Sequence, residues 1–393
     1  MPDPGPAVVP PVRDARLDVL RGLALVMIFI NHVPGTHWEG WTSRNFGFSD
    51  AAEGFVFMSG LAAGLAYSGG FRRAPFWPAT TRVWGRAWTL ILVHMTVTVI
   101  ALGLTGAAAL WFGLHEMTRI NNVPPLLADP LAGFLGLALL SHQLGYMNIL
   151  PLYAVLLAVT PALLIAALRV PLALVAVSVA VWLVAGSLRI APPTWPVPSI
   201  WFFNPLSWQL LFVLGLVSGT AMKRGRRLVP VRRWLVVLSA AVVGCIMVWA
   251  IWDDLGARLN AGMFALRDTW LPDFLLDYDK TFVSGPRVLH FLALAYLLSA
   301  LPAVRRACEH PAAWPLAVLG RHGLTVFALG TVLAFAGQAV KLAGLRVGLE
   351  RDLLLDSAIL VAGLGTQLAV AMVRERAAGR RRLGASPPPA ARR

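Results

Sequence analysis

Charged residues are scarce in this sequence. They occupy 13% of its 393 positions, whereas hydrophobic residues occupy 58%. Soluble domains usually contain about 25% charged residues, so this composition excludes an ordinary soluble protein. Apolar stretches long enough to cross a bilayer core of roughly 30 Å as helices recur along nearly the whole chain. They leave no polar segment large enough for a separate soluble domain.

Acidic residues are the scarcer of the two charged kinds. The chain has 19 Asp and Glu against 34 Lys and Arg, a net charge of +15. A basic excess can indicate nucleic-acid binding, but here the basic residues follow membrane topology. Counted from a cytoplasmic N-terminus, the basic loop 223–233 and the Arg-rich segment from Arg374 both fall on the cytoplasmic side. We therefore expect membrane lipid as a partner and no nucleic acid.

The chain has only two cysteines. Cys245 falls inside an apolar stretch and Cys308 in a cytoplasmic loop, so no structural disulfide is expected. No internal repeat is visible either, which leaves an inverted-repeat transporter without support from the sequence. The residue pattern implies no metal.

The apolar stretches predict an all-α, polytopic membrane helix bundle with about ten transmembrane helices and both termini cytoplasmic. The expected spans lie near residues 17–35, 51–69, 83–106, 146–168, 170–188, 205–222, 234–252, 287–302, 314–340 and 352–373. One membrane domain would cover residues 13–376, between disordered tails at 1–12 and 377–393. Segment 131–140 is apolar but short, so we interpret it as a re-entrant or interfacial helix; an additional crossing there would reverse the sides that follow.

Two ionisable residues mark the first expected span. Arg21 and His32 are eleven residues apart, close to three helical turns, so they share one face and lie about 16 Å apart along the axis. Ionisable side chains are costly in a bilayer, which makes each of them a functional hypothesis. The alternatives are snorkelling or pairing with Asp18 for Arg21, and an interfacial structural role for His32.

Two carboxylates begin the second expected span. Asp50 and Glu53 are one turn apart, where they could be the N-cap and N3 residues of a capping box. One of them could instead hold the His32 ring in the tautomer that lets its other nitrogen act as a general base on a hydroxyl. The two interpretations are compatible.

Several runs of the sequence resemble the OpgC family of membrane succinyltransferases, within the acyltransferase 3 superfamily. RLDVLRGLALVMIFINHVPG looks like the family's opening helix, and the spacing from Arg21 to His32 matches the superfamily's Arg and His. The other runs follow in family order across most of the chain: RNFGFSDAAEGFVFMSG, NILPLYAVLLAVTP, NPLSWQLLFVLG, DKTFVSGPRVLHFLALAY and LGRHGLTVFALG.

The resemblance implies a reaction. His32 would be the catalytic base, Asp50 or Glu53 its orienting partner, and Arg21 part of the passage for the acyl donor. The implied donor is acyl-CoA, succinyl-CoA in particular, and the implied acceptor is a carbohydrate, a periplasmic glucan. One departure from the family pattern is Asn148, where an acid is more usual, and this puts the acceptor in question.

Further polar residues fall at the outer ends of the spans or in outer loops. They are candidates for substrate binding, although a single residue of this kind is more often an interfacial anchor than a ligand. These candidates are Arg44, Asn45, Asn148, Asp279, Lys280, Arg287 and His290. Of the many tryptophans, only Trp38 and Trp41 lie near His32 in sequence, and we consider them for stacking on a sugar.

Basic residues at the cytoplasmic ends are candidates for the phosphates of coenzyme A, because arginine forms bidentate pairs with phosphate. Arg82 and Arg86 share a helix face at the membrane boundary, although the positive-inside rule predicts basic residues there in any case. Arg321 falls inside or at the edge of the ninth expected span, where it needs a partner.

The sequence thus favours a transmembrane O-acyltransferase in the bacterial inner membrane, multi-pass, with its oligomeric state open. Two rivals remain. An O-acetyltransferase of another envelope polysaccharide would share this composition, and a transporter or flippase would line its path with similar charges.

The predicted topology can be tested with reporter fusions. A periplasm-dependent reporter fused after residue 40 or after residue 260 should be active, because both positions fall in outer loops. Cytoplasmic signals from both fusions would contradict the predicted sidedness.

Overall fold

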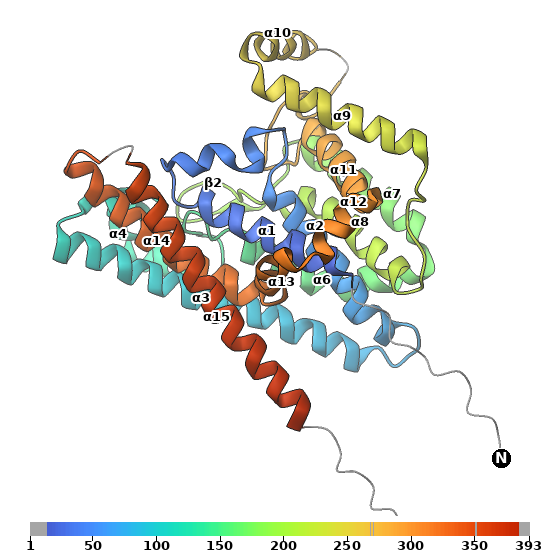
Figure 1. The fold of residues 1–393 in the computed structure, drawn as a ribbon, viewed down its shortest axis with the longest axis horizontal. Helices are drawn as coiled ribbons and strands as arrows, with labels where there is room; N and C mark the ends of the chain where they lie inside the picture. Colours follow the sequence, from blue (N-terminus) through green and yellow to red (C-terminus); the bar gives the residue numbers. More distant parts are fainter. Residues whose placement is uncertain (1–13, 268, 270, 350–351, 385–393) are drawn as a thin grey trace, which may run out of the picture.

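The computed structural model describes residues 14–267, 269, 271–349 and 352–384, and this part of the chain is almost entirely helical (Figure 1). The α-helices are α1 (Ala15–Asn31), α2 (Ala51–Tyr67), α3 (Trp77–Phe112), α4 (Pro124–Ala128), α5 (Pro130–Ala138), α6 (Ile149–Arg169), α7 (Pro171–Ser187), α8 (Pro205–Met222), α9 (Arg233–Ile251), α10 (Asp253–Phe264), α11 (Gly285–Ala300), α12 (Pro302–Glu309), α13 (Trp314–Arg321), α14 (Gly323–Arg346) and α15 (Leu353–Gly384). The described strands are two-residue segments, β1 (Pro193–Thr194) and β2 (Ser199–Ile200), which pair antiparallel. The all-α class is therefore confirmed.

Seven described helices are long and apolar enough to cross a membrane, or eight if the bent pair α11 and α12 forms one span. The seven are α2 continued by the 3-10 turn η3 (Ser68–Phe71), α3, α6, α8, α9, α14 and α15. The expected number of about ten is not confirmed. Two of the expected spans correspond to α1 and α7, which have 17 residues each. Helices of that length rise only about 25 Å, less than a typical hydrocarbon core.

Segment 131–140 agrees with the expectation of a short helix, since most of it forms α5 and makes no full crossing. Two further differences separate the structure from the expected pattern. The expected span 314–340 is broken at His322 between α13 and α14. Residues 377–384, assigned to a disordered tail, continue α15 as helix to Gly384, whereas the remaining tail residues lie outside the described chain.

Glycines allow α2 and α8 to pack in backbone contact. A Cβ atom added at Gly60 would lie 2.0 Å from the carbonyl oxygen of Phe212, and one added at Gly215 would lie 2.0 Å from that of Phe57. Gly64 and Gly219 repeat the arrangement one turn along, so both helices carry glycine at four-residue spacing. This small-residue seam is a common way for membrane helices to associate.

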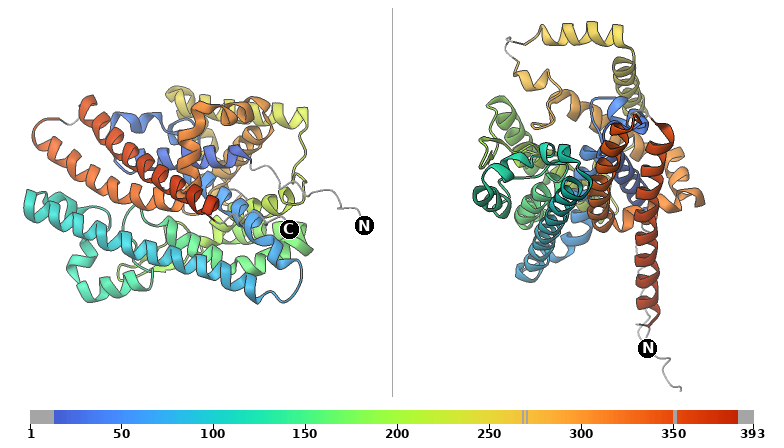
Figure 2. Two further views of the ribbon diagram at one scale, coloured as in Figure 1. Left: turned by 60° about the horizontal axis from the view of Figure 1, so that its bottom comes forward. Right: turned by 90° about the vertical axis from the view of Figure 1, so that its left-hand side faces the viewer.

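A second close contact joins α1 to α13. A Cβ atom at Gly320 would lie 1.8 Å from the carbonyl oxygen of Asp18, and one at Gly22 would lie 2.0 Å from that of Leu316. The two seams fix α1 and α2, the helices that carry the first candidate residues. Away from this centre, α9 and α10 lie at one edge of the molecule, while α3 and α15 extend beyond its body (Figures 1 and 2).

The seam between α2 and α8 predicts an unequal response to two glycine substitutions. Gly60→Ala should destabilise the protein by about 1–3 kcal/mol, because the two helices must separate to admit the methyl group. Gly103→Ala, on α3, is the matched control because an added Cβ there meets nothing within 4 Å. Thermal unfolding in detergent measures both, and equal melting temperatures would contradict the close contact.

Candidate active site

Two cavities of about 490 Å³ each lie at different levels of the same helices. The first, here the His32 cavity, is formed mainly at the end of α1 and the starts of α2 and α6. It is lined by Ile28, Asn31, His32, Arg44, Asp50, Ala51, Ala52, Asn121, Asn122, Gly145, Tyr146, Asn148, Ile149, Phe202, Phe203, Lys280 and Phe327. The second, here the arginine cavity, contains Arg21, Arg86, Arg321 and Arg374 in its lining.

His32 directly follows α1 and is held through both its ring and its backbone. Its ring packs against that of Tyr146, with centroids 4.6 Å apart and planes inclined by 44°. Its carbonyl oxygen accepts a hydrogen bond of 2.7 Å from Gln338 Nε2, and Gln338 Oε1 accepts one of 2.7 Å from Asn121 Nδ2. Residues from α14 and from the segment before α4 therefore position the end of α1.

Backbone strain is concentrated at this cavity. Six described residues other than glycine have positive φ, and three of them line the His32 cavity: Asn121 at 57°, Asn122 at 60° and Tyr146 at 66°. The two segments are joined, since the Gly145 amide donates to the Asn121 carbonyl oxygen at 2.8 Å. Such conformations cost of order 1–3 kcal/mol each and cluster at functional sites. The strain at Tyr146 accompanies the contact of its ring with His32.

A chain of four charged side chains, half-buried at one end and buried at the other, lies beside the cavity. Lys280 Nζ donates to Asp50 Oδ2 at 2.5 Å, Arg287 lies 3.5 Å from the same oxygen, and Arg287 Nε donates to Glu53 Oε1 at 2.7 Å. Exposure falls along the chain, from 26% for the Lys280 side chain to 0% for Glu53. Two acids and two bases make the group neutral, as burial requires.

Asp50 and Glu53 also form the predicted capping box at the start of α2. Asp50 Oδ1 accepts from the Ala52 amide at 2.8 Å, and Glu53 Oε2 accepts from the Asp50 amide at 2.9 Å. Burial opposes ionisation of Asp50, but the nearby cations Lys280 and Arg287 outweigh it and hold the pKa of this carboxyl below its usual range. Asp50 is therefore a carboxylate facing the His32 cavity.

The expected bond between His32 and a carboxylate is absent from the described residues. No hydrogen bond joins the His32 ring to Asp50 or Glu53, since Lys280 and Arg287 occupy the two carboxylates. The charged groups that act on the ring are Lys280 and Asp50. An orienting role for a carboxylate stays a prediction, and the contact that the structure provides is the ring of Tyr146.

The structure brings five of the predicted residues into one cavity lining: His32, Asp50, Arg44, Asn148 and Lys280. The other predicted residues at this end lie outside the lining and have structural partners. These pairs are Glu53 with Arg287, Asn45 Nδ2 with the Glu39 carbonyl oxygen at 2.7 Å, Asp279 with Arg189 at 2.7 Å, and His290 Nδ1 with Ser49 Oγ at 2.7 Å.

Four aromatic side chains of the lining were missed by the sequence analysis: Tyr146, Phe202, Phe203 and Phe327. Trp38 and Trp41, considered for sugar stacking, are not in the lining, and Trp41 is 76% exposed. Asn121 and Asn122 were missed too. Adjacent asparagines are a signal for left-handed backbone conformations, and that signal could have drawn attention to them.

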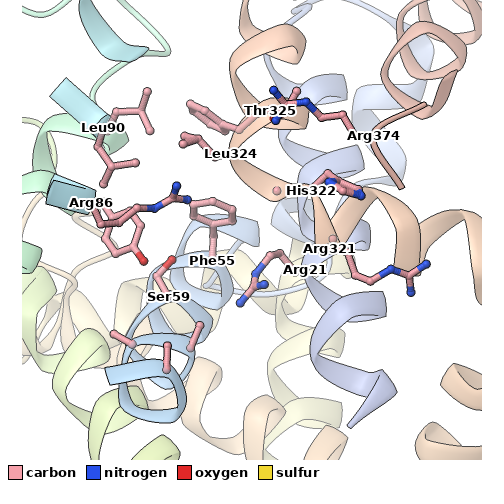
Figure 3. Close-up of a pocket in the computed structure, with 18 of the residues that line it drawn as sticks. Arg21, Phe55, Ser59, Arg86, Leu90, Arg321, His322, Leu324, Thr325 and Arg374 are labelled. Carbon is pink, nitrogen blue, oxygen red and sulfur yellow. The ribbon is translucent and has the colours of Figure 1, made fainter. Parts of the chain in front are cut away.

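The arginine cavity collects basic side chains from four helices (Figure 3). Arg21 and Arg86, both predicted donor-binding residues, lie around the ring of Phe55 in this view, whereas Arg321 turns away from it. The lining also includes hydroxyl residues, namely Ser59, Tyr67, Tyr153 and Thr325. Guanidinium and hydroxyl groups together can bind phosphate.

Arg321 has the partner that its position required. Its Nε lies 3.1 Å from Glu375 Oε1, and His322 Nε2 lies 2.8 Å from the other oxygen of the same carboxylate. Arg374 adds a cation that the sequence analysis did not select, and its side chain donates to Thr325 Oγ1 at 2.5 Å. Arg82 does not line the cavity, since its Nε donates to the Pro78 carbonyl oxygen at 3.2 Å.

The chain matches a known protein family. A family model described as "OpgC protein" matches residues 13–379, nearly the whole chain. No curated protein and no solved structure matches the chain. Among the described residues, no group of three or more His, Cys, Asp or Glu side chains is arranged to hold a metal ion.

The buried charge chain predicts a non-additive response to substitution. Arg287→Met should destabilise the protein by about 3–5 kcal/mol, because it leaves the enclosed Glu53 carboxylate without its cation. Adding Glu53→Gln should recover most of that loss, since the amide is neutral and can still accept from the Asp50 amide. Melting temperatures of both single variants and the double variant measure the coupling. Additive losses would show that the two side chains act independently.

Proposed function

The chain belongs to the OpgC protein family, and from this membership and the site geometry we propose that it is an acyltransferase of the bacterial inner membrane. It moves an acyl group, a succinyl unit in particular, from acyl-CoA to hydroxyls of a periplasmic glucan. The observation that carries the proposal is the relation between His32 and Arg21. The two residues lie near opposite ends of α1, in different cavities, about 16 Å apart along the helix.

The donor binds in the arginine cavity. Phosphates of coenzyme A contact Arg21 and Arg86, with Arg374 as a third cation, because guanidinium groups bind phosphate oxygens bidentately. Arg321 contributes less directly, since Glu375 already occupies its guanidinium. The acyl end of the donor extends from this cavity toward His32.

The acceptor binds in the His32 cavity. Tyr146 and Phe202 offer aromatic faces to a sugar ring, while Asn121, Asn122 and Asn148 offer amide donors and acceptors for its hydroxyls. Arg44 and Lys280 are in the same lining, paired with Glu39 and Asp50, and their remaining N–H groups can donate to the carboxylate of a succinyl group but find no such acceptor on acetyl.

The reaction requires one base and no covalent enzyme intermediate. A ring nitrogen of His32 takes the proton of a sugar hydroxyl as its oxygen attacks the thioester carbonyl carbon. Amide donors from the asparagines stabilise the oxyanion that forms. The carbon–sulfur bond then breaks, and the coenzyme A thiolate receives the proton from His32. The products are the sugar ester and free coenzyme A.

Asp50 is the carboxylate better placed to influence His32. It lines the same cavity, whereas Glu53 is fully enclosed and paired with Arg287. An ionised Asp50 stabilises the imidazolium formed when His32 takes the proton. Lys280 moderates this effect because its positive charge, bonded to Asp50, disfavours the imidazolium form of His32.

A transporter would also have cavities at two levels of one helix bundle. The two functions differ in their products, since only a transferase makes a new ester and releases coenzyme A. Mass spectrometry of envelope glycans from cells with and without the gene identifies the acyl group and its acceptor, and acetyl esters in place of succinyl would favour the related O-acetyltransferase function.

The proposed reaction predicts a severe loss on removal of His32. Purified His32→Ala protein should release coenzyme A with acceptor at least about 100-fold more slowly than the parent, because general base catalysis contributes 10²–10⁴-fold. His115→Ala is the control, since His115 is exposed and lines neither cavity. Its rate should be unchanged, and both variants should keep the parental melting temperature. Turnover of His32→Ala at the parental rate would exclude this mechanism.

A further inference from the structure

One residue belongs to both cavities. Phe327, on α14, is in the lining of the His32 cavity and in that of the arginine cavity, and its side chain is 4% exposed. The two cavities therefore approach each other from opposite sides of a single phenylalanine.

Phe55 completes the boundary from the facing helix. Its ring centroid is 6.0 Å from that of Phe327, and it lines the arginine cavity from α2 (Figure 3). On the same helix Ala52, one turn earlier, lines the His32 cavity. On α6 the boundary falls between two neighbouring residues, since Ile149 lines the His32 cavity and Leu150 lines the arginine cavity. The partition is about one layer of side chains thick.

A buried histidine lies at this level on α3. Leu90 lines the arginine cavity, and Thr98 contacts Met147, the neighbour of Asn148 in the His32 cavity. His94 is midway between them, one turn from each on the same helix face, and it is in the lining of neither cavity. Its side chain is 1% exposed, and neither ring nitrogen has a hydrogen-bond partner among the described residues. An unpaired buried imidazole is costly unless something polar binds it.

We propose that Phe327 and Phe55 form the gate through which the acyl-bearing arm of a coenzyme A thioester crosses from the arginine cavity to His32, with His94 binding an amide of that arm. This inference rests on the proposed function. The Phe327 ring also limits the width of the acyl group that passes, so it determines donor specificity.

The gate has a chemical purpose. The donor thioester would be hydrolysed if water from the His32 cavity reached it before the acceptor did. Two apolar rings that close on each other, or on the narrow donor arm, exclude that water. The amides of the arm lose their hydrogen bonds to water in this apolar passage, and the His94 ring replaces one of those bonds.

Substitutions of Phe327 test the gate directly. Phe327→Ala should use a bulky donor such as benzoyl-CoA about tenfold better relative to succinyl-CoA, and should hydrolyse donor without acceptor several-fold faster. Phe327→Trp should reduce transfer from succinyl-CoA. Phe335→Ala is the matched control, because Phe335 is a buried phenylalanine on the same helix that lines neither cavity. If Phe327→Ala shows the same donor preference and the same rate of donor hydrolysis as Phe335→Ala, the gate is overturned.

A labelling experiment tests the gate without requiring activity. In a background with Cys245→Ser and Cys308→Ser, the variant Ser59→Cys carries a single thiol in the arginine cavity. A membrane-impermeant maleimide applied from the His32 side should label this thiol faster once Phe327→Ala is added, but not once Phe335→Ala is added. Equal rates would overturn the gate. If the parent protein transfers no acyl group, the proposed function is refuted. The labelling rates would still show whether Phe327 separates the two cavities.

His94→Leu separates binding from structure. It should raise the KM for succinyl-CoA with little change in kcat, because it removes a contact made throughout the crossing. It should also raise the melting temperature, since an unpaired polar side chain leaves the interior. His94→Gln should restore the KM. An unchanged KM, or a lower melting temperature, would remove His94 from the passage.

Discussion

The site depends on the requirement that charges inside an apolar bundle be neutralised by partners. Lys280, Asp50, Arg287 and Glu53 satisfy it as one chain of alternating charges that joins the start of α2 to the start of α11. Any one of these side chains alone would be expensive to bury. Together they fix the wall of the His32 cavity and keep Asp50 ionised.

Close helix packing supplies the rigidity around that wall. The glycine seams between α2 and α8, and between α1 and α13, bring backbones into contact and leave no room for sliding. Two of the helices that line the cavities, α1 and α2, are thus each held by a seam along one side.

Much of the site could be predicted because topology alone brings span ends together. Counting crossings put His32, Asp50, Arg44, Asn148 and Lys280 at one end of the bundle, and all five line one cavity. The same reasoning could not tell which charges pair with each other. Glu53 and Arg287 are 234 residues apart in sequence, and only packing shows that they neutralise each other. Hydropathy could not determine the number of spans either. The helices α1 and α7 are apolar, but each is only 17 residues long.

The sequence by itself determined the membrane class, the helical fold and the likeness to the OpgC family, because hydropathy and motif order are properties of the chain. Only the tertiary structure decided that Tyr146 faces His32, that Phe327 lies between the two cavities and that His94 has no hydrogen-bond partner in the described part of the chain. Phenylalanine, tyrosine and histidine occur throughout such a bundle. What distinguishes these three is their neighbours on other helices, and those follow from how the helices pack.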